Sequence, residues 1–422
     1  MKRLRILHSA DFHIGMRFRD YSCGEQLREA RLSAVDRVVA AANERECDIL
    51  TVGGDLFERR AIPKADVRRV TESLARFAGV AVLVLPGNHD YIGGESSLWS
   101  EFRESSPDHV YLLSDPEPFD LRPFALDAVV FPAPCDAKHS ETNRIGWIAE
   151  RLNGSETVDG DTVLIGLAHG SIEGVSPDFA ESYFPMTRAE LEGAGVDLWL
   201  MGHSHVTWPP APDPRERIVN PGTPEPDGFD CSHAGHALYV ELGGGGDGGD
   251  ETHTGAGERT ELGGGGDGGD GAERVSAAAR RGAAGSSPGS HRRYPSTIEI
   301  VQTGMYRFRR EHRTLRSIHD VQRLGAELGG PNLSNTAVRL TLDGRLDNEA
   351  MEALPGALER VRANVLELDM RRDDLHEAIT TERIDREYAA ASFAARLLHE
   401  LAEAEDHEAL EEAWEMLREC AR

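Results

Sequence analysis

The sequence predicts an α/β fold in which a layered domain is followed by a small α/β cap and a C-terminal helical pair. Strand-like apolar runs alternate with helix-like segments as far as residue 242, the pattern of a layered α/β domain. A smaller alternation covers 315–380, and 381–422 shows helical amphipathic spacing. With 422 residues, the chain is long enough for two or three domains.

Residues 1–242 are expected to form the first domain. Its strand-like runs end in the same way, with a polar residue directly after the apolar ones. They read "RLRILHSAD", "DILTVGGD", "VAVLVLPGN", "TVLIGLAH" and "VDLWLMGHSH", with helices expected near 24–46 and 64–78.

Residues 243–293 have a different composition, because "ELGGGGDGGD" occurs at 241–250 and again at 261–270. No apolar core can be built from such sequence, so we expect a disordered acidic Gly-rich insert. A phosphate-binding loop is disfavoured, since no P-loop lysine or helix-forming segment follows the glycines. The flanking runs "HALYVEL" and "STIEIVQTGMYRF" resemble strands that could pair, and 294–314 would then return the chain to the first domain.

Beyond residue 314, helices are expected near 317–328 and 347–361, with strands at "TAVRLTL" and "ANVLELDM". Two amphipathic helices are expected to close the chain. The apolar face of the first would carry Ile384, Tyr388, Phe393, Leu397 and Leu401, and that of the second Leu410, Trp414 and Leu417. Either intramolecular packing on the cap or docking on a partner would use these faces.

The composition is strongly acidic, with a formal net charge of −27 and only three lysines. Such a surface is typical of a halophilic protein, although an acidic mesophilic protein with disordered tails is the alternative. The five scattered cysteines include no C-x-x-C pair, which favours a reducing compartment, and hence a cytoplasmic location, over a disulfide framework or zinc ribbon. We expect no signal sequence and no membrane helix.

Five of the apolar runs deliver side chains of metal-binding type at their carboxyl ends. Ligands bind at the carboxyl ends of strands in sheets built from β-α units, and the i, i+2 spacing of D-x-H and H-x-H directs two side chains to one side of an extended chain. Each motif alone is weak evidence, but their joint occurrence predicts a metal site of Mn, Fe or Zn type. Seven ligands suit two ions that share a carboxylate. They are Asp11, His13, Asp55, Asn88, His169, His203 and His205.

These motifs, "DFH", "GGDLFE", "GNHD", a lone histidine after a strand, and "GHSH", resemble those of the calcineurin-like metallophosphoesterases, over about residues 1–242. Within that superfamily the sequence is most similar to the SbcD-like exonucleases of DNA double-strand-break repair, the nuclease subunit of an SMC-type ATPase complex. That similarity depends on "HSADFHIG", "GGDLFERR" and "NPGTPEPDGFD", and on the cap and terminal helices. The resemblance implies a layered β-sandwich flanked by helices.

The resemblance also implies roles for the site residues. Asp11, His13 and His205 would hold one ion, Asn88, His169 and His203 a second, and Asp55 would bridge them, with Mn²⁺ the expected metal. His89 would approach the scissile phosphate and Asp90 would orient it. The acidic insert and Glu58, which stands where the family typically has Asp, depart from the family pattern.

Two functions remain open. The first is a two-metal DNA nuclease, a 3′→5′ exonuclease with single-strand endonuclease activity. Its expected partners are DNA, an SMC-like (SbcC-like) ATPase and a second copy of the chain, and no membrane is expected to be involved. The alternative is a phosphodiesterase or phosphatase for small nucleotides or other phosphoesters. The DNA-binding residues are not assigned, because Arg59 and Arg60 suit a solvated loop better. His8 is expected to be buried and structural, and His233 and His236 to lie on the surface.

Overall fold

The computed structural model describes residues 3–93, 97–154, 162–176, 182–243, 295–330, 333–404 and 406–420. The Gly-rich insert expected at 243–293 lies outside these residues except for Gly243. Among the described helices, none is both long enough and apolar enough to span a membrane.

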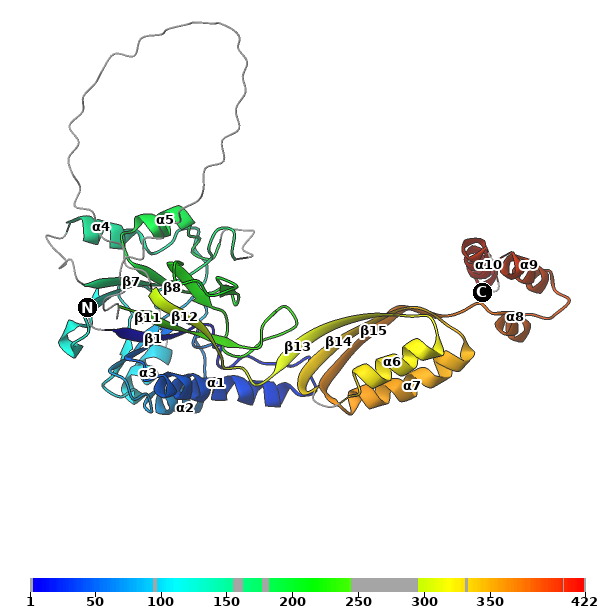
Figure 1. The fold of residues 1–422 in the computed structure, drawn as a ribbon, viewed down its shortest axis with the longest axis horizontal. Coiled ribbons are helices and arrows are strands. Elements are labelled where there is room, and N and C mark those ends of the chain that lie inside the picture. The colour runs from blue at the N-terminus through cyan, green and yellow to red at the C-terminus, as the bar shows by residue number, and fades with distance from the viewer. Residues whose placement is uncertain are drawn as a thin grey trace, which may run out of the picture.

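The first layer of the N-terminal domain is a six-stranded sheet with the order β12-β11-β1-β2-β3-β4. Strands β1 to β4 run parallel, and β11 is antiparallel to both of its neighbours, β1 and β12. Helices α1, α2 and α3 cover the outer face of this sheet (Figure 1). The strands are β1 (Leu4–Ser9), β2 (Ile49–Gly53), β3 (Ala81–Leu85), β4 (Val110–Leu112), β11 (His236–Leu242) and β12 (Pro295–Gln302), and the helices are α1 (Gly24–Glu44), α2 (Lys64–Leu74) and α3 (Leu98–Ser105).

The second layer is another six-stranded sheet, with the order β5-β6-β7-β8-β10-β9. Helices α4 and α5 lie on its outer face (Figure 1). An apolar core fills the space between the two sheets, so the domain is a sandwich of two sheets with helices outside. The elements are β5 (Phe119–Asp120), η1 (Arg122–Phe124), β6 (Ala128–Ala133), α4 (Gly146–Gly154), β7 (Val163–His169), α5 (Arg188–Gly193), β8 (Leu198–Gly202), β9 (Thr207–Trp208) and β10 (Ile218–Pro221).

His8 connects the two layers. Its ring is fully buried, with Nδ1 2.9 Å from the Thr51 hydroxyl in the first sheet and Nε2 2.8 Å from the Met201 carbonyl in the second. Burial lowers the pKa of His8 to about 4, so the ring is neutral and structural.

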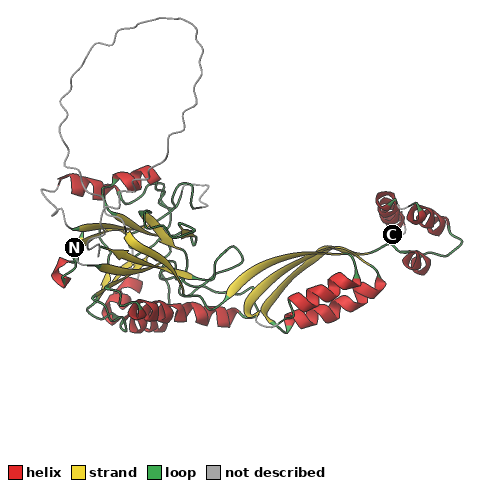
Figure 2. Ribbon diagram, viewed as in Figure 1, coloured by secondary structure: helices red, strands yellow, loops and turns green. Residues whose placement is uncertain are grey.

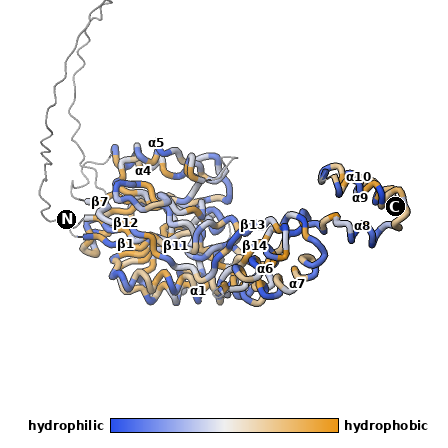
Figure 3. Tube along the Cα trace, turned by 45° about the vertical axis from the view of Figure 1, so that its right-hand side comes forward, coloured by the Kyte–Doolittle hydropathy of each residue, from blue (hydrophilic) through white to orange (hydrophobic). Residues whose placement is uncertain are grey.

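The chain leaves the first sheet through β12 and enters a three-stranded parallel sheet of order β13-β14-β15. Helices α6 and α7 pack on one face of this cap sheet (Figure 2) and form a separate apolar core with it. In both domains the apolar residues concentrate on the strands and the facing sides of the helices (Figure 3). The cap consists of β13 (Arg307–Leu315), α6 (Ile318–Glu327), β14 (Leu333–Leu346), α7 (Asn348–Arg362) and β15 (Val365–Glu377).

The C-terminal segment contains three helices, α8 (Thr381–Glu387), α9 (Phe393–Glu403) and α10 (His407–Cys420). The apolar pattern expected for one helix from Ile384 to Leu401 is interrupted, because Ser392 accepts a hydrogen bond from Ala395 N and starts a new helix. Phe393 is therefore not on the buried face, and its side chain is 69% exposed. Leu398 takes the buried position instead, in a core that includes Trp414.

Candidate metal centre

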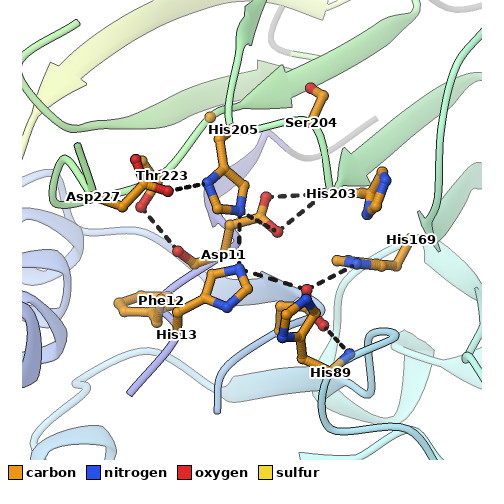
Figure 4. Close-up of polar contacts among 12 residues, drawn as sticks. Asp11, Phe12, His13, His89, His169, His203, Ser204, His205, Thr223 and Asp227 are labelled. Carbon is orange, nitrogen blue, oxygen red and sulfur yellow. Dashed lines mark hydrogen bonds and ion pairs between the residues drawn. The ribbon is translucent and has the colours of Figure 1, made fainter. Parts of the chain in front are cut away.

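The seven predicted ligands lie at the carboxyl ends of β1, β2, β3, β7 and β8, where His169 ends β7 and the other six are on the loops that follow. Figure 4 shows five of them, Asp11, His13, His169, His203 and His205. The first three strands belong to one sheet and the last two to the other. The candidate centre therefore lies where the two layers come together.

His13 and His205 face each other with their Nε2 atoms 2.9 Å apart. The Nδ1 of His13 lies 2.9 Å from a Glu58 carboxylate oxygen, and the Nδ1 of His205 lies 2.6 Å from that of Asp227. A carboxylate only accepts hydrogen bonds, so each Nδ1 carries a proton and Nε2 is the ring atom that each imidazole turns toward the other. An oxygen of Asp11 lies 3.8 Å from Nε2 of His205. The two Nε2 atoms are within hydrogen-bond distance, at a place where a divalent cation would be bound by both rings.

His169, Asn88 and His203 form a second group of the same kind. His169 Nδ1 donates to the Gly53 carbonyl at 2.9 Å, which leaves Nε2 facing Asn88 Oδ1 at 3.0 Å. Nδ1 of His203 lies 3.1 Å from the same oxygen. The amide NH₂ of Asn88 donates to the Lys138 carbonyl at 3.3 Å, and this contact turns its oxygen toward the two imidazoles.

Asp55 lies between the two groups. Its Oδ2 is 3.5 Å from His13 Nε2 and 3.4 Å from His169 Nε2, and its Oδ1 accepts the backbone NH of His89 at 2.8 Å. Burial acts to raise the pKa of Asp55, but the imidazoles of His169 and His13 outweigh it and hold the carboxyl well below its usual range. A buried set of imidazole, carboxylate and amide donors without thiolate fits two divalent cations.

His89 and Asp90 lie on the loop after β3, but they do not act on each other as expected. His89 Nδ1 lies 3.0 Å from the Glu58 carbonyl and 3.9 Å from its carboxylate. The two oxygens of Asp90 accept the backbone NH groups of Gly87 and Phe57 instead, at 2.7 and 3.0 Å. The structure therefore places Glu58 beside the His89 ring. Asp90 stabilises the loop after β3 through hydrogen bonds from the backbone.

Several of the ligand-bearing residues adopt left-handed backbone conformations, which are costly for residues other than glycine. Such conformations persist only where the surrounding structure enforces them. Here, the left-handed conformations direct the ligand side chains of one loop toward the same site. The residues and their φ values are Asp11 57°, His13 46°, Asp55 50°, His203 104° and His205 53°.

Two glycines let the loops approach closely. A Cβ on Gly87 would lie 2.2 Å from Asp55 Oδ1, and one on Gly54, whose φ is +98°, would lie 2.1 Å from His169 Nδ1. Neither position can accept a side chain without moving a predicted ligand.

A comparison with protein families matches residues 4–207 to calcineurin-like phosphoesterases. All seven predicted ligands lie within this range. Residues 4–207 form a calcineurin-like phosphoesterase domain. The chain thus carries a phosphoester hydrolase domain of a family that binds divalent metals, and the predicted superfamily and α/β fold class are confirmed.

Curated relatives of the phosphoesterase domain differ in what their names say. The chain is 27% identical over 213 residues to an uncharacterized metallophosphoesterase, YhaO, of Bacillus subtilis, covering 48% of each chain. It is 28% identical to the DNA double-strand break repair protein Mre11 of Methanopyrus kandleri over 242 residues (53% of this chain, 49% of the relative). It is also 28% identical to Mre11 of Aeropyrum pernix over 267 residues, which cover 57% of this chain and 58% of the relative. The chain thus spans about half the length of the curated relatives it matches.

Among solved structures, TT1561 of Thermus thermophilus is 16% identical, with a TM-score of 0.34, over 57% of this chain and 94% of that one.

The phosphoesterase site contains residues that the sequence reasoning missed. Asp227 belongs to the quoted "NPGTPEPDGFD" segment, but its position in the chain did not reveal its contact with His205. His233 was expected on the surface; the structure half-buries it, stacks it on His236 at 4.4 Å, and places its Nε2 3.0 Å from the His205 carbonyl. The guanidinium of Arg60 packs over Tyr91 at 4.6 Å from the ring centre.

Proposed function

We propose that this protein is a two-metal DNA nuclease, a 3′→5′ exonuclease with single-strand endonuclease activity, that acts in double-strand-break repair. The observation that carries the proposal is the position of Asp55 Oδ2, within 3.5 Å of one imidazole from each candidate group. One carboxylate shared by two sets of imidazole, carboxylate and amide donors is the arrangement expected of a bridged metal pair.

In this proposal, one divalent ion is held by Asp11, His13 and His205. Asn88, His169 and His203 hold the other, Asp55 bridges them, and Mn²⁺ is the metal. When bound, such a pair supplies a water of lowered pKa and neutralises phosphate charge. Glu58 and Asp227 keep the imidazoles of His13 and His205 in the tautomer that offers Nε2 to the metal.

His89 is proposed to assist the leaving group. Its side chain is 30% exposed and its ring lies 4.8 Å from that of His13, so it stands at the accessible edge of the site. With Nδ1 turned to the Glu58 carbonyl, Nε2 is the ring atom available to a substrate oxygen. Asp90 contributes indirectly, through the loop that it holds.

Two observations support DNA as the substrate. Two relatives are named as Mre11 DNA double-strand break repair proteins, and the chain adds a cap and terminal helices to the phosphoesterase domain. The alternative, a phosphodiesterase or phosphatase for small nucleotides, is kept because a third relative is named only as a metallophosphoesterase.

A partner ATPase of the SMC type is proposed to dock on the C-terminal helices. Phe393 of α9 and Met416 of α10 are 69% and 59% exposed, and exposed large apolar side chains on amphipathic helices suit docking on another helix. Replacing both by Gln should abolish co-purification of the ATPase, whereas Met305→Gln, at a site that is 47% exposed next to the cap, should not. Retained co-purification would contradict this docking.

We further propose that the protein is a homodimer and that it works in the cytoplasm at high salt. Light scattering in concentrated KCl measures the molar mass and so tests the dimer.

The deciding experiment is hydrolysis with Mn²⁺ in concentrated KCl. Labelled single- and double-stranded DNA are compared with cyclic nucleotides and an aryl phosphodiester. DNA degraded to mononucleotides by the unaltered protein, but not by Asp55→Asn or His89→Gln, is expected; the surface variant His312→Asn is the control. Hydrolysis of the small esters without hydrolysis of DNA would contradict the nuclease proposal and favour the phosphodiesterase alternative.

A further inference from the structure

The segment from Thr223 to Asp230, here called the connecting segment, touches both the candidate metal centre and the cap. It follows β10 and belongs to no helix or strand. It is therefore a physical connection between two parts of the molecule that have separate apolar cores.

On one side, the connecting segment holds the loops of the first metal group. The Thr223 hydroxyl lies 2.8 Å from the Asp11 carbonyl, and the Asp227 carboxylate binds the Nδ1 of His205 at 2.6 Å (Figure 4). Arg31, whose side chain is buried in α1, donates to the carbonyls of Phe12 and Glu225, both at 2.7 Å. In the second group, His169 contacts the Gly53 carbonyl and Asn88 the Lys138 carbonyl, and both carbonyls lie outside this segment.

On the other side, the connecting segment is held by the cap and by the chain that leads into it. Phe229 is 7% exposed; its ring centre lies 5.2 Å from that of Phe308 and 4.2 Å from the guanidinium carbon of Arg339. Arg310 Nε donates to the Phe229 carbonyl at 3.0 Å. The buried carboxylate of Glu225 accepts the backbone NH groups of residues 305 and 306, at 2.8 and 2.9 Å, just before β13.

We propose that the cap sets the metal affinity of the first group through the connecting segment, with Asp227 as the positioning residue for His205. Only Gly228 separates Asp227 from the cap-bound Phe229, so a displacement of Phe229 moves the carboxylate that orients the imidazole. Partners behind a metal ligand change affinity about 10- to 100-fold when lost. This inference rests on the proposed metal centre, but not on the proposed substrate.

The test measures Mn²⁺ binding by the loss of the free-ion electron paramagnetic resonance signal, without any hydrolysis assay. Phe229→Ala and Asp227→Asn should each weaken one of two Mn²⁺ affinities about tenfold and leave the other unchanged. Phe229→Tyr, which keeps the ring, should bind as the unaltered protein does. The double variant should bind no more weakly than Asp227→Asn alone, because both changes act through one contact.

Single-site backgrounds identify the group affected. In His203→Ala, which retains the first group, Phe229→Ala should still weaken binding; in His205→Ala it should have no effect. Glu367→Gln is the matched control, because Glu367 joins the cap to Cys23 N at 3.2 Å without using the connecting segment, and it should change neither affinity.

Unchanged affinity in Phe229→Ala, a loss that persists in His205→Ala, or additive losses in the double variant would each overturn the inference. Thermal unfolding of every variant verifies folding. Absence of Mn²⁺ binding by the unaltered protein would overturn the metal centre as well. Failure to cleave DNA with both Mn²⁺ affinities intact would count against the proposed function alone.

Discussion

The Nε2 atoms of His13 and His205 lie 2.9 Å apart, although each ring has its Nδ1 proton committed to a carboxylate. With both Nδ1 protons committed to carboxylates, the two Nε2 atoms face each other at the place where the proposed first metal ion would bind. The consequences concern stability as well as chemistry.

The first prediction is that metal removal destabilises the protein. Ions that bind the folded chain but not the unfolded chain stabilise the fold, so EDTA should lower the melting temperature and Mn²⁺ should restore it. At a concentration 100 times the Kd, one bound ion adds about 2.7 kcal/mol to the free energy of unfolding. Asp55→Asn should lose most of this Mn²⁺-dependent shift in calorimetry. Equal melting temperatures with EDTA and Mn²⁺ would contradict it.

The second prediction concerns Gly87. Its replacement by Ala places a methyl group 2.2 Å from Asp55 Oδ1, which must displace the bridging carboxylate. We expect a loss of about 1–3 kcal/mol in unfolding free energy, as is typical of overpacking, and hydrolytic activity reduced at least about 100-fold. Gly146→Ala is the control, because a Cβ there meets nothing within 4 Å. Normal activity in Gly87→Ala would contradict this prediction, because it would show that the loop after β3 can move without displacing the Asp55 carboxylate.

The third prediction is a loss of stability in acid that depends on His8. Burial lowers the pKa of this ring from about 6.5 to about 4, so between these values the unfolded chain binds a proton that the folded chain does not. The contribution to stability is complete above pH 6.5 and is lost as the pH falls toward 4; by pH 5 the loss is about 2 kcal/mol.

Urea unfolding of the metal-free protein and of His8→Gln, each at pH 7 and pH 5, measures this contribution. The comparison uses the change between the two pH values, because the variant also loses the contacts with Thr51 and Met201. The same pH dependence in both proteins would show that other groups cause the loss.

The fourth prediction separates the C-terminal helices from the metal centre. Trp414 is 4% exposed and packs edge-on against Tyr388, with ring centres 5.5 Å apart. Trp414→Ala should destabilise this helical unit by about 3–5 kcal/mol and expose it to proteolysis, while Mn²⁺ binding stays unchanged. Met416→Ala, on the exposed face of the same helix, should be neutral. Protease resistance in Trp414→Ala would contradict the assigned core.

Much of the fold and of the candidate site could be predicted from local sequence. Apolar runs of strand length, each ending in Asp, Asn or His, identify the strands and place metal-binding side chains at their carboxyl ends. The same motifs lead to the phosphoesterase superfamily. These features lie within single segments of chain, where periodicity and residue type are sufficient.

Contacts between distant segments could not be predicted in this way. Asp227 meets His205 from 22 positions away, and Glu58 lies against His13 from 45 positions away, because neighbouring strands of one sheet, β8 and β10 or β1 and β2, bring their loops together. The family resemblance implied that Asp90 orients His89; the backbone turns Asp90 toward Gly87 and Phe57 instead.

The helix boundary at Ser392 and the burial of His233 have the same origin. A capping serine competes with a continuous apolar pattern, and only packing around Leu398 and Trp414 decides between them. His233 is half-buried because its segment folds back onto His205. The sequence by itself therefore determined which residues could carry the chemistry, since ligand type and strand ends are local properties. The tertiary structure decided which groups orient them, because those groups come from other parts of the chain.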